Sequence, residues 1–108
     1  MAEPLKENTV FSYDEAAAML PEVRLVTDEA YRAVEALSAS PDKDAEERLN
    51  DVVGRWVAAM LSRGLEVKGL WLVDFDNGNG YYCWRYPETG LMFYHSYDEG
   101  FGGRMRIQ

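Results

Sequence analysis

The chain has 108 residues, a hydrophobic fraction of 47% and a formal net charge of −8. A chain of this length folds as one domain without needing a disulfide or structural metal. Its negative charge repels phosphate backbones, which argues against nucleic acid as a partner. The sequence shows no signal peptide, no possible internal disulfide and no apolar run near the roughly 18 residues of a membrane span. We therefore expect one soluble domain, residues 1–108, in a reducing cytoplasm and without a membrane partner.

The N-terminal part predicts a short helix followed by a long one. Ser12 and Glu15 match a capping box, in which each side chain accepts a hydrogen bond from the other residue's backbone amide. A helix should therefore begin at Tyr13. Pro21 has no amide hydrogen for the helical ladder, so the chain either bends there or restarts in a new helix, and we favour the restart. Apolar residues then recur at helical spacing as far as Leu37.

A second long helix follows after a tight turn. Ser40 is suited to the N-cap, Pro41 to the first helical position and Gly64 to the C-terminal cap. Between them, residues 45 to 61 carry a wide apolar stripe at helical spacing. Residues 12–64 should thus form an antiparallel helical hairpin whose apolar surface needs a further layer to cover it.

That further layer is predicted to be a sheet. Three runs rich in β-branched and aromatic residues are separated by two turns that contain glycine: Leu70–Phe75, Tyr81–Tyr86 and Leu91–His95, with turns at Asp76–Gly80 and Pro87–Gly90. Residues 69–95 should form a three-stranded antiparallel meander. Residues 96–108 contain several glycines and are predicted to form an irregular tail. The expected fold is therefore α+β, with the helical hairpin packed on the meander.

The register of the second hairpin decides which polar residues meet. If its loop has four residues with Gly90 left-handed, Trp84 pairs with Phe93, Cys83 with Tyr94 and Tyr82 with His95. A loop one residue shorter instead places His95 opposite Cys83. Whether those two side chains meet therefore depends on a shift of one residue.

Asp74 ends a hydrophobic strand, where an unpaired carboxylate is costly to bury. It either pairs with Arg85 or Arg104, or it opens the turn and folds its side chain onto the amide of Asn77 or Gly78. The residues leave both alternatives open.

His95 and Cys83 are the only histidine and the only cysteine of the chain. The histidine could act as a general base, or anchor the glycine-rich tail by hydrogen bonds. One histidine and one cysteine are poor material for zinc, so the sequence predicts no metal site. The cysteine lacks any nucleophile motif and is expected to be a small buried side chain.

Aromatic side chains are too numerous for one small sheet to bury in a monomer. They are Trp71, Tyr82, Trp84, Tyr86, Phe93, Tyr94, Tyr97 and Phe101. Either they form a dimer interface or they line a pocket for a planar ligand. We favour the interface and expect a homodimer, because interfaces are the commoner cause of an apolar excess.

Five short motifs in order resemble a small uncharacterised bacterial family, domain of unknown function 2203. They lie at residues 11–21, 72–75, 83–85, 94–95 and 100–104 and cover nearly the whole chain. The chain departs from the family pattern at Asp76, where proline is usual, and at Tyr94, where tryptophan is usual. The resemblance implies a prokaryotic cytoplasmic protein and supplies no activity, substrate or cofactor. It also places Asp74, Arg85, His95 and Arg104 at motif positions.

Two functions follow from these residues, and we rank binding first. In the binding hypothesis, a small anionic or planar molecule is held by two arginines, the amides of the glycine loop and two aromatic rings: Arg85, Arg104, Gly100, Phe101, Gly103, Trp84 and Tyr94. In the enzymatic alternative, a small hydrolase uses His95 as general base, oriented by Asp74 and aided by Arg104.

Overall fold

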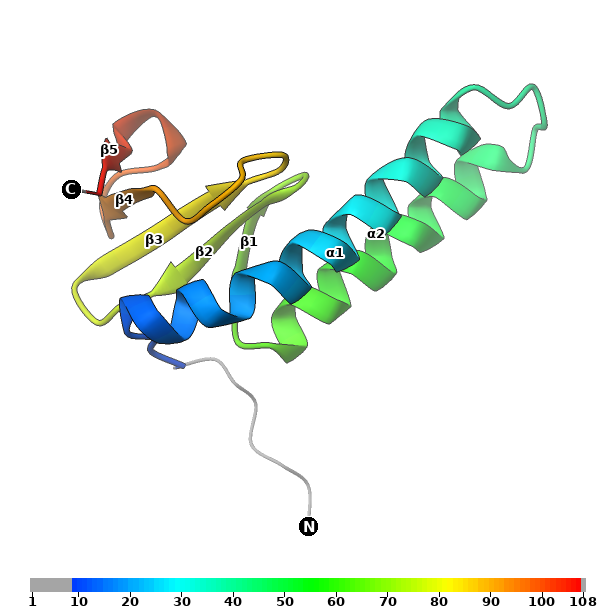
Figure 1. Cartoon of the computed structure of the whole chain (residues 1–108). Coiled ribbons are helices and arrows are strands. Elements are labelled where there is room, and N and C mark those ends of the chain that lie inside the picture. Colours follow the sequence, from blue (N-terminus) through cyan, green and yellow to red (C-terminus); the bar gives the residue numbers. More distant parts are fainter. Residues whose placement is uncertain (1–8, 108) are drawn as a thin grey trace, which may run out of the picture.

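The computed structural model describes residues 9–107 and consists of a helical hairpin and a five-stranded sheet (Figure 1). The remaining residues of the predicted domain, 1–8 and 108, lie outside the described residues. The elements in chain order are α1 (Tyr13–Ser38), α2 (Ala45–Ser62), β1 (Glu66–Gly69), β2 (Leu72–Asp76), β3 (Gly80–Arg85), β4 (Phe93–Ser96), a 3₁₀ turn η1 (Phe101–Gly103) and β5 (Met105–Arg106).

Helix α1 begins as predicted but does not restart at Pro21. The capping box is confirmed, with the Ser12 hydroxyl accepting from the Glu15 amide at 3.1 Å. The predicted restart is wrong, because one helix runs through Pro21 to Ser38. Interior proline costs a helix about 3 kcal/mol. Leu20 and Val23, which flank it, are both buried in the core, and their packing keeps the two halves in one helix.

Helix α2 begins at Ala45, later than predicted. The Ser40 hydroxyl accepts from the Asp42 amide at 3.2 Å, and the Asp42 carboxylate accepts from the Asp44 amide at 2.9 Å. These side chains therefore cap the connecting turn instead of the helix. At the other end the predicted glycine cap is confirmed, because Gly64 directly follows the C-cap residue and has a φ of +85°.

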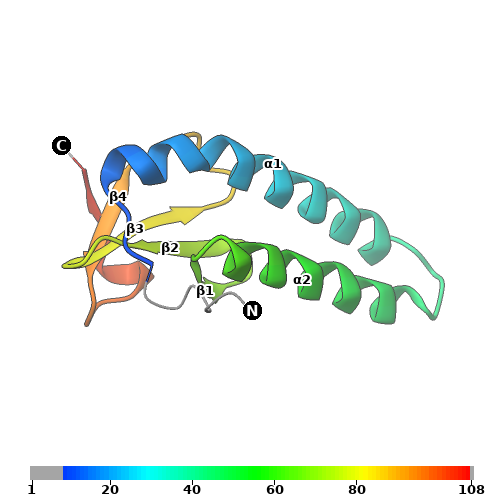
Figure 2. The same ribbon diagram turned by 90° about the horizontal axis from the view of Figure 1, so that it is seen from below.

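The two helices pack against each other along their length, and the end of the hairpin near the turn projects beyond the sheet (Figures 1 and 2). The indole nitrogen of Trp56 donates to the Thr27 hydroxyl at 2.8 Å inside this buried interface. Among the described residues, no helix is long and apolar enough to cross a membrane.

The sheet is an antiparallel meander in the order β1-β2-β3-β4-β5, so the predicted α+β class is confirmed. The predicted number of three strands is wrong. Strand β1 is a short polar edge strand, and β5 is a pair of residues in the tail that was expected to be irregular. Leu70 and Trp71 belong to the turn between β1 and β2, where Trp71 adopts a φ of 64° and buries its side chain in the core.

The second hairpin has a register that neither sequence alternative contained. Cys83 lies opposite Phe93, and His95 lies opposite Tyr81. The connection is longer than predicted, because Leu91 leaves the strand to enter the core and its carbonyl accepts from the Tyr13 hydroxyl at 3.0 Å. Consequently β4 begins only at Phe93.

Alternation along the strands gives the sheet two different faces. The inner face packs against the helices and carries Val73, Phe75 and Trp84, all fully buried. The outer face carries Asp74, Cys83 and His95 and is covered by the C-terminal segment with η1 (Figure 2). The candidate site lies on this outer face.

Candidate functional site

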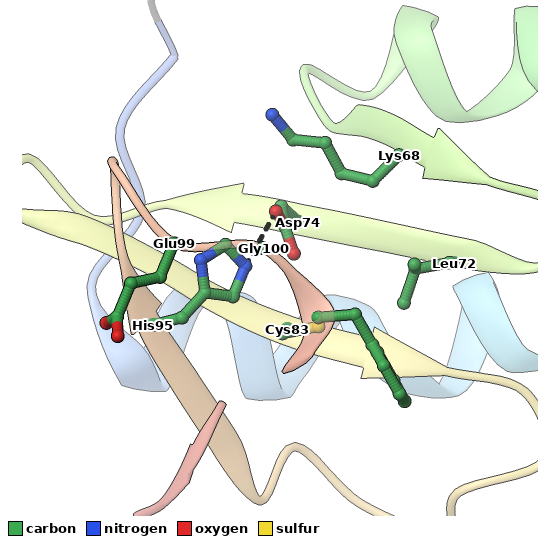
Figure 3. A pocket seen from close by; sticks show the side chains of 8 residues that line it. Lys68, Leu72, Asp74, Cys83, His95, Glu99 and Gly100 are labelled. Carbon is green, nitrogen blue, oxygen red and sulfur yellow. Dashed lines mark hydrogen bonds and ion pairs between the residues drawn. The ribbon is translucent and has the colours of Figure 1, made fainter. Parts of the chain in front are cut away.

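Three neighbouring strands bring three polar side chains together on the outer face. Asp74 of β2 lies directly opposite Cys83 of β3, and His95 of β4 approaches from the next strand (Figure 3). One potential ligand atom of each residue lies within 4.8 Å of the other two. The structure thus assembles an Asp–Cys–His cluster from residues that are 9 and 12 positions apart in the sequence.

Gly80 allows β4 to come this close. It lies opposite Ser96, and a Cβ atom added at Gly80 would stand 2.5 Å from the carbonyl oxygen of His95. Any side chain here would therefore force β4 away from β3. The last glycine of the predicted turn thus also helps to place His95.

The Asp74–His95 pair is buried, with side-chain exposures of 1% and 3%. Its Oδ2 and Nε2 atoms are 2.9 Å apart. The other ring nitrogen, Nδ1, lies 2.9 Å from the carbonyl oxygen of Ser96. Each ring nitrogen faces an oxygen acceptor, so either the imidazole carries two protons or the carboxyl carries one.

The second carboxylate oxygen of Asp74, Oδ1, is buried and has no hydrogen-bond partner among the described residues. The Cys83 thiol lies near Asp74 on the same face of the sheet, but a thiol is only a weak hydrogen-bond donor (Figure 3). Burial raises the pKa of the Asp74 carboxyl, an effect that its interactions with His95 and Cys83 oppose. A buried carboxylate oxygen without a donor is costly and calls for an explanation.

Burial, with a contribution from Asp74, also raises the pKa of the Cys83 thiol to about 12. The thiol therefore keeps its proton near neutral pH in the free protein. A nucleophilic cysteine needs the thiolate, so Cys83 is not poised for attack. Its position agrees with the expected small buried side chain.

The cluster lies in a pocket with a volume of about 250 Å³. Its lining combines acidic, basic and apolar residues: Lys68, Leu72, Asp74, Cys83, His95, Glu99, Gly100 and Phe101. Sequence reasoning did not select Lys68 or Glu99. Lys68 lies on strand β1, which the sequence analysis did not recognise. The alternation of side chains along that strand was the one signal that could have identified Lys68. Nothing in the sequence around Glu99 indicated the pocket.

Arg104 is already engaged by protein groups. Its guanidinium donates to both carboxylate oxygens of Glu88, at 3.1 and 2.8 Å. It also lies 4.0 Å from the ring centroid of Phe93 and 4.1 Å from that of Phe101. A guanidinium whose fork is filled and whose faces are stacked attaches the tail to the sheet and is not free to bind an anion.

The other predicted binding residues are divided between the two faces. Trp84 is fully buried on the inner face, and Tyr94 shares that face through its pairing with Tyr82. Arg85 is exposed, with its guanidinium 5.4 Å from the ring centroid of Phe101. Of the glycine loop, Gly100 and Phe101 line the pocket, whereas the amide of Gly103 donates to the carbonyl of Gly100 at 2.9 Å. The predicted set is therefore not brought together around one ligand.

Asp74 adopts neither arrangement that the sequence left open, because its partner is His95. The turn-opening role belongs to Asp76, whose Oδ1 accepts from the Gly78 amide at 2.9 Å. Asp76 ends β2, two residues nearer the turn than Asp74, so its side chain, and not that of Asp74, reaches the Gly78 amide.

Comparison with known proteins identifies the family. A family model described as "Uncharacterized conserved protein (DUF2203)" matches residues 9–107. No curated protein and no solved structure matches this chain. The match spans all of the described residues, including both helices, the sheet and the pocket. The chain therefore belongs to the DUF2203 family of uncharacterised conserved proteins, as its motifs predicted.

Proposed function

We propose that the protein binds a small polar molecule in the outer-face pocket, at whose base the Asp74–His95 pair lies. The observation that carries this proposal is the buried Asp74 Oδ1, which makes no regular hydrogen bond among the described residues, lies beside the weak donor Cys83 and borders a pocket. Leaving such an oxygen unpaired costs about 1–3 kcal/mol, more for a charged group, and a ligand that donates a hydrogen bond to it would recover that cost.

The pocket's charges and size indicate the class of ligand. Asp74 and Glu99 contribute carboxyl groups and Lys68 an ammonium group, so the lining is not the basic cradle that the sequence suggested. At about 250 Å³ the pocket is smaller than typical drug-sized sites. A metabolite of a few heavy atoms with an amino or hydroxyl donor fits this lining best. A carboxylate of that metabolite could reach Lys68 only by sharing the ammonium group with Glu66, with which Lys68 is paired at 3.0 Å.

The enzymatic alternative is less well supported. The Asp74–His95 distance of 2.9 Å meets its first requirement, that an aspartate orients the histidine. A general base also needs one ring nitrogen free to take a proton from substrate. In this structure Nε2 faces Asp74 and Nδ1 faces the carbonyl of Ser96. The geometry therefore favours binding over proton abstraction.

A ligand screen tests the proposed binding. Thermal shift is measured with amino acids, amines, polyols, nucleotides, phosphate and carboxylate metabolites. A true ligand at 100 times its Kd should stabilise the protein by about 2.7 kcal/mol. Asp74→Asn should weaken binding of that ligand at least tenfold.

The matched control is Asp76→Asn, which changes a carboxylate on the same strand that bonds the turn amide and the Tyr97 hydroxyl. It should leave the affinity unchanged. A screen without hits, or equal affinity of Asp74→Asn and the wild type, would contradict the proposal.

The homodimer expected from the sequence remains a proposal. Part of the aromatic excess that suggested it is buried within one chain, including Trp71 and Trp84. The exposed apolar side chains that remain on the C-terminal part are Tyr94, Tyr97, Phe101 and Met105. These are the candidates for a contact between two copies. Light scattering at micromolar concentration tests the dimer, and a monomeric mass would remove it.

A further inference from the structure

We propose that Asp74, Cys83 and His95 bind one transition-metal ion, of which Zn²⁺ is the expected type, at the base of the pocket. This inference deepens the proposed function, because the metal would lie where the small molecule binds. Carboxylate oxygen, thiolate sulfur and imidazole nitrogen are the three donors that zinc accepts in proteins. Thiolate and imidazole together favour zinc-like ions over magnesium or calcium.

The spacing of the three donors is close to that of a metal site. Zinc bonds of about 2.0–2.3 Å place the donors of a tetrahedral site roughly 3.3–3.8 Å apart. In the structure the three donor atoms lie within 4.8 Å of one another, and the Asp74–His95 pair is 2.9 Å apart. An ion bound to both would thus have to spread the Asp74–His95 pair by about half an ångström.

The surroundings of His95 match those of a metal-binding histidine. Such a histidine commonly donates from one ring nitrogen to a backbone carbonyl and binds the metal through the other. Here Nδ1 faces the carbonyl of Ser96 at 2.9 Å, which leaves Nε2 directed toward Asp74. With an ion between Nε2 and Asp74, a neutral imidazole satisfies both contacts and no second proton is needed.

A divalent ion also balances the buried charges. Binding releases the thiol proton of Cys83, so that a thiolate and the Asp74 carboxylate together carry two negative charges against the two positive charges of the ion. The same carboxylate, without the ion, leaves Oδ1 buried and without a partner among the described residues. Coordinated through Oδ1, or through both carboxylate oxygens, the ion would give this oxygen a partner.

Three protein donors leave a tetrahedral ion with one open position. In proteins such a position holds water or a donor atom of the substrate or ligand. The three residues all line the pocket, so the open position would face the space in which the small molecule binds. Lys68, also in the lining, could then contact an anionic group of a molecule bound to the ion.

Cobalt spectroscopy of the chelator-treated full-length chain tests the site without any ligand. Co²⁺ should bind in one equivalent, with a thiolate-to-cobalt charge-transfer band in the near ultraviolet and strong visible bands of a tetrahedral ion. Zn²⁺ should displace it. Cys83→Ser should remove the charge-transfer band, and Asp74→Asn should weaken binding at least tenfold. Asp76→Asn changes a carboxylate on the same strand that lies outside the pocket lining and should bind Co²⁺ as the wild type does.

Circular dichroism of each variant verifies its fold, and Cys83→Ser, the smallest change, decides the matter if Asp74→Asn does not fold. The proposal is overturned if the wild type gives no saturable cobalt spectrum, or if Cys83→Ser retains the charge-transfer band. Repeating the ligand screen with chelator and with Zn²⁺ separates the two proposals. If a ligand binds in the presence of chelator and no cobalt spectrum is seen, the proposed ligand pocket stands and the metal site is excluded. If a cobalt spectrum is seen but no ligand binds, the metal site stands and the proposed ligand binding is contradicted.

Discussion

Both faces of the sheet contain fully buried residues, but these residues are apolar on the inner face and polar on the outer face. On the inner face, Val73 and Trp84 are fully buried among apolar side chains contributed by the helices. On the outer face, Asp74 and Cys83 are just as inaccessible, yet they are polar and lie beside a pocket. Burial of apolar area stabilises a fold, whereas burial of an incompletely paired carboxylate opposes it. The contrast supports the proposal that the outer face binds a ligand, whereas the inner face stabilises the fold.

The covers of the two faces differ as well. Two long helices cover the inner face with a continuous core. The outer face is covered by a short glycine-rich segment. It is attached by Arg104, which lies between Phe93 and Phe101 and pairs with Glu88, and by the short β4–β5 pairing. A cover with so few contacts opens at lower free energy than the core does. Such a cover suits a site that must admit a ligand.

The largest effect on stability is expected on the inner face. Replacing fully buried Trp84 by alanine should lower the free energy of unfolding by about 3–5 kcal/mol, because a large cavity remains. The indole nitrogen, which donates to the carbonyl of Glu88 at 2.9 Å, is lost as well. Denaturant unfolding measures the change. Phe101→Ala on the outer face, where the ring is 39% exposed, should cost far less, and equal losses would contradict the contrast between the faces.

A smaller effect is expected from the buried hydrogen bond between Trp56 and Thr27 of the two helices. Thr27→Val preserves shape but leaves the indole nitrogen of Trp56 without its acceptor, so the free energy of unfolding should fall by about 1–3 kcal/mol. Thr27→Ser retains the hydroxyl and serves as the control. If the valine variant is as stable as the serine variant, this hydrogen bond does not contribute, and the helix interface is stabilised by apolar packing alone.

The smallest effect concerns the rim of the inner face, where the Tyr86 hydroxyl donates to Asp28. This hydrogen bond is the main reason why the pKa of Asp28 lies below its ordinary value of 3.8. A lowered folded-state pKa adds stability above the ordinary value, and that stability is lost as the pH falls through the folded-state pKa. The wild type should therefore lose more stability than Tyr86→Phe between about pH 5 and pH 2. Parallel curves of unfolding free energy against pH would show that the hydrogen bond has no effect.

Much of the candidate site could be named from the sequence, but its arrangement could not. Asp74 and His95 were selected together because both are polar residues in apolar strands. Cys83 was predicted to be a small buried side chain, and no metal site was predicted, because the sequence offers only one cysteine and one histidine. Arg104 was predicted to bind a ligand because its ion pair with Glu88 could not be foreseen. Glu88 belongs to a loop whose conformation the sequence does not specify. Residues that meet only through strand pairing leave no local pattern.

The sequence by itself determined the features that depend on neighbours a few residues apart. The capping box at Ser12, the glycine cap at Gly64, the helical stripes and the glycine turn after β2 all follow from local hydrogen bonds and φ preferences. Tertiary structure decided the rest. Core packing of Leu20 and Val23 keeps α1 continuous across Pro21. Burial of Leu91 sets the register of β4. That register, chosen by contacts between distant segments, is what places His95 beside Asp74 and Cys83.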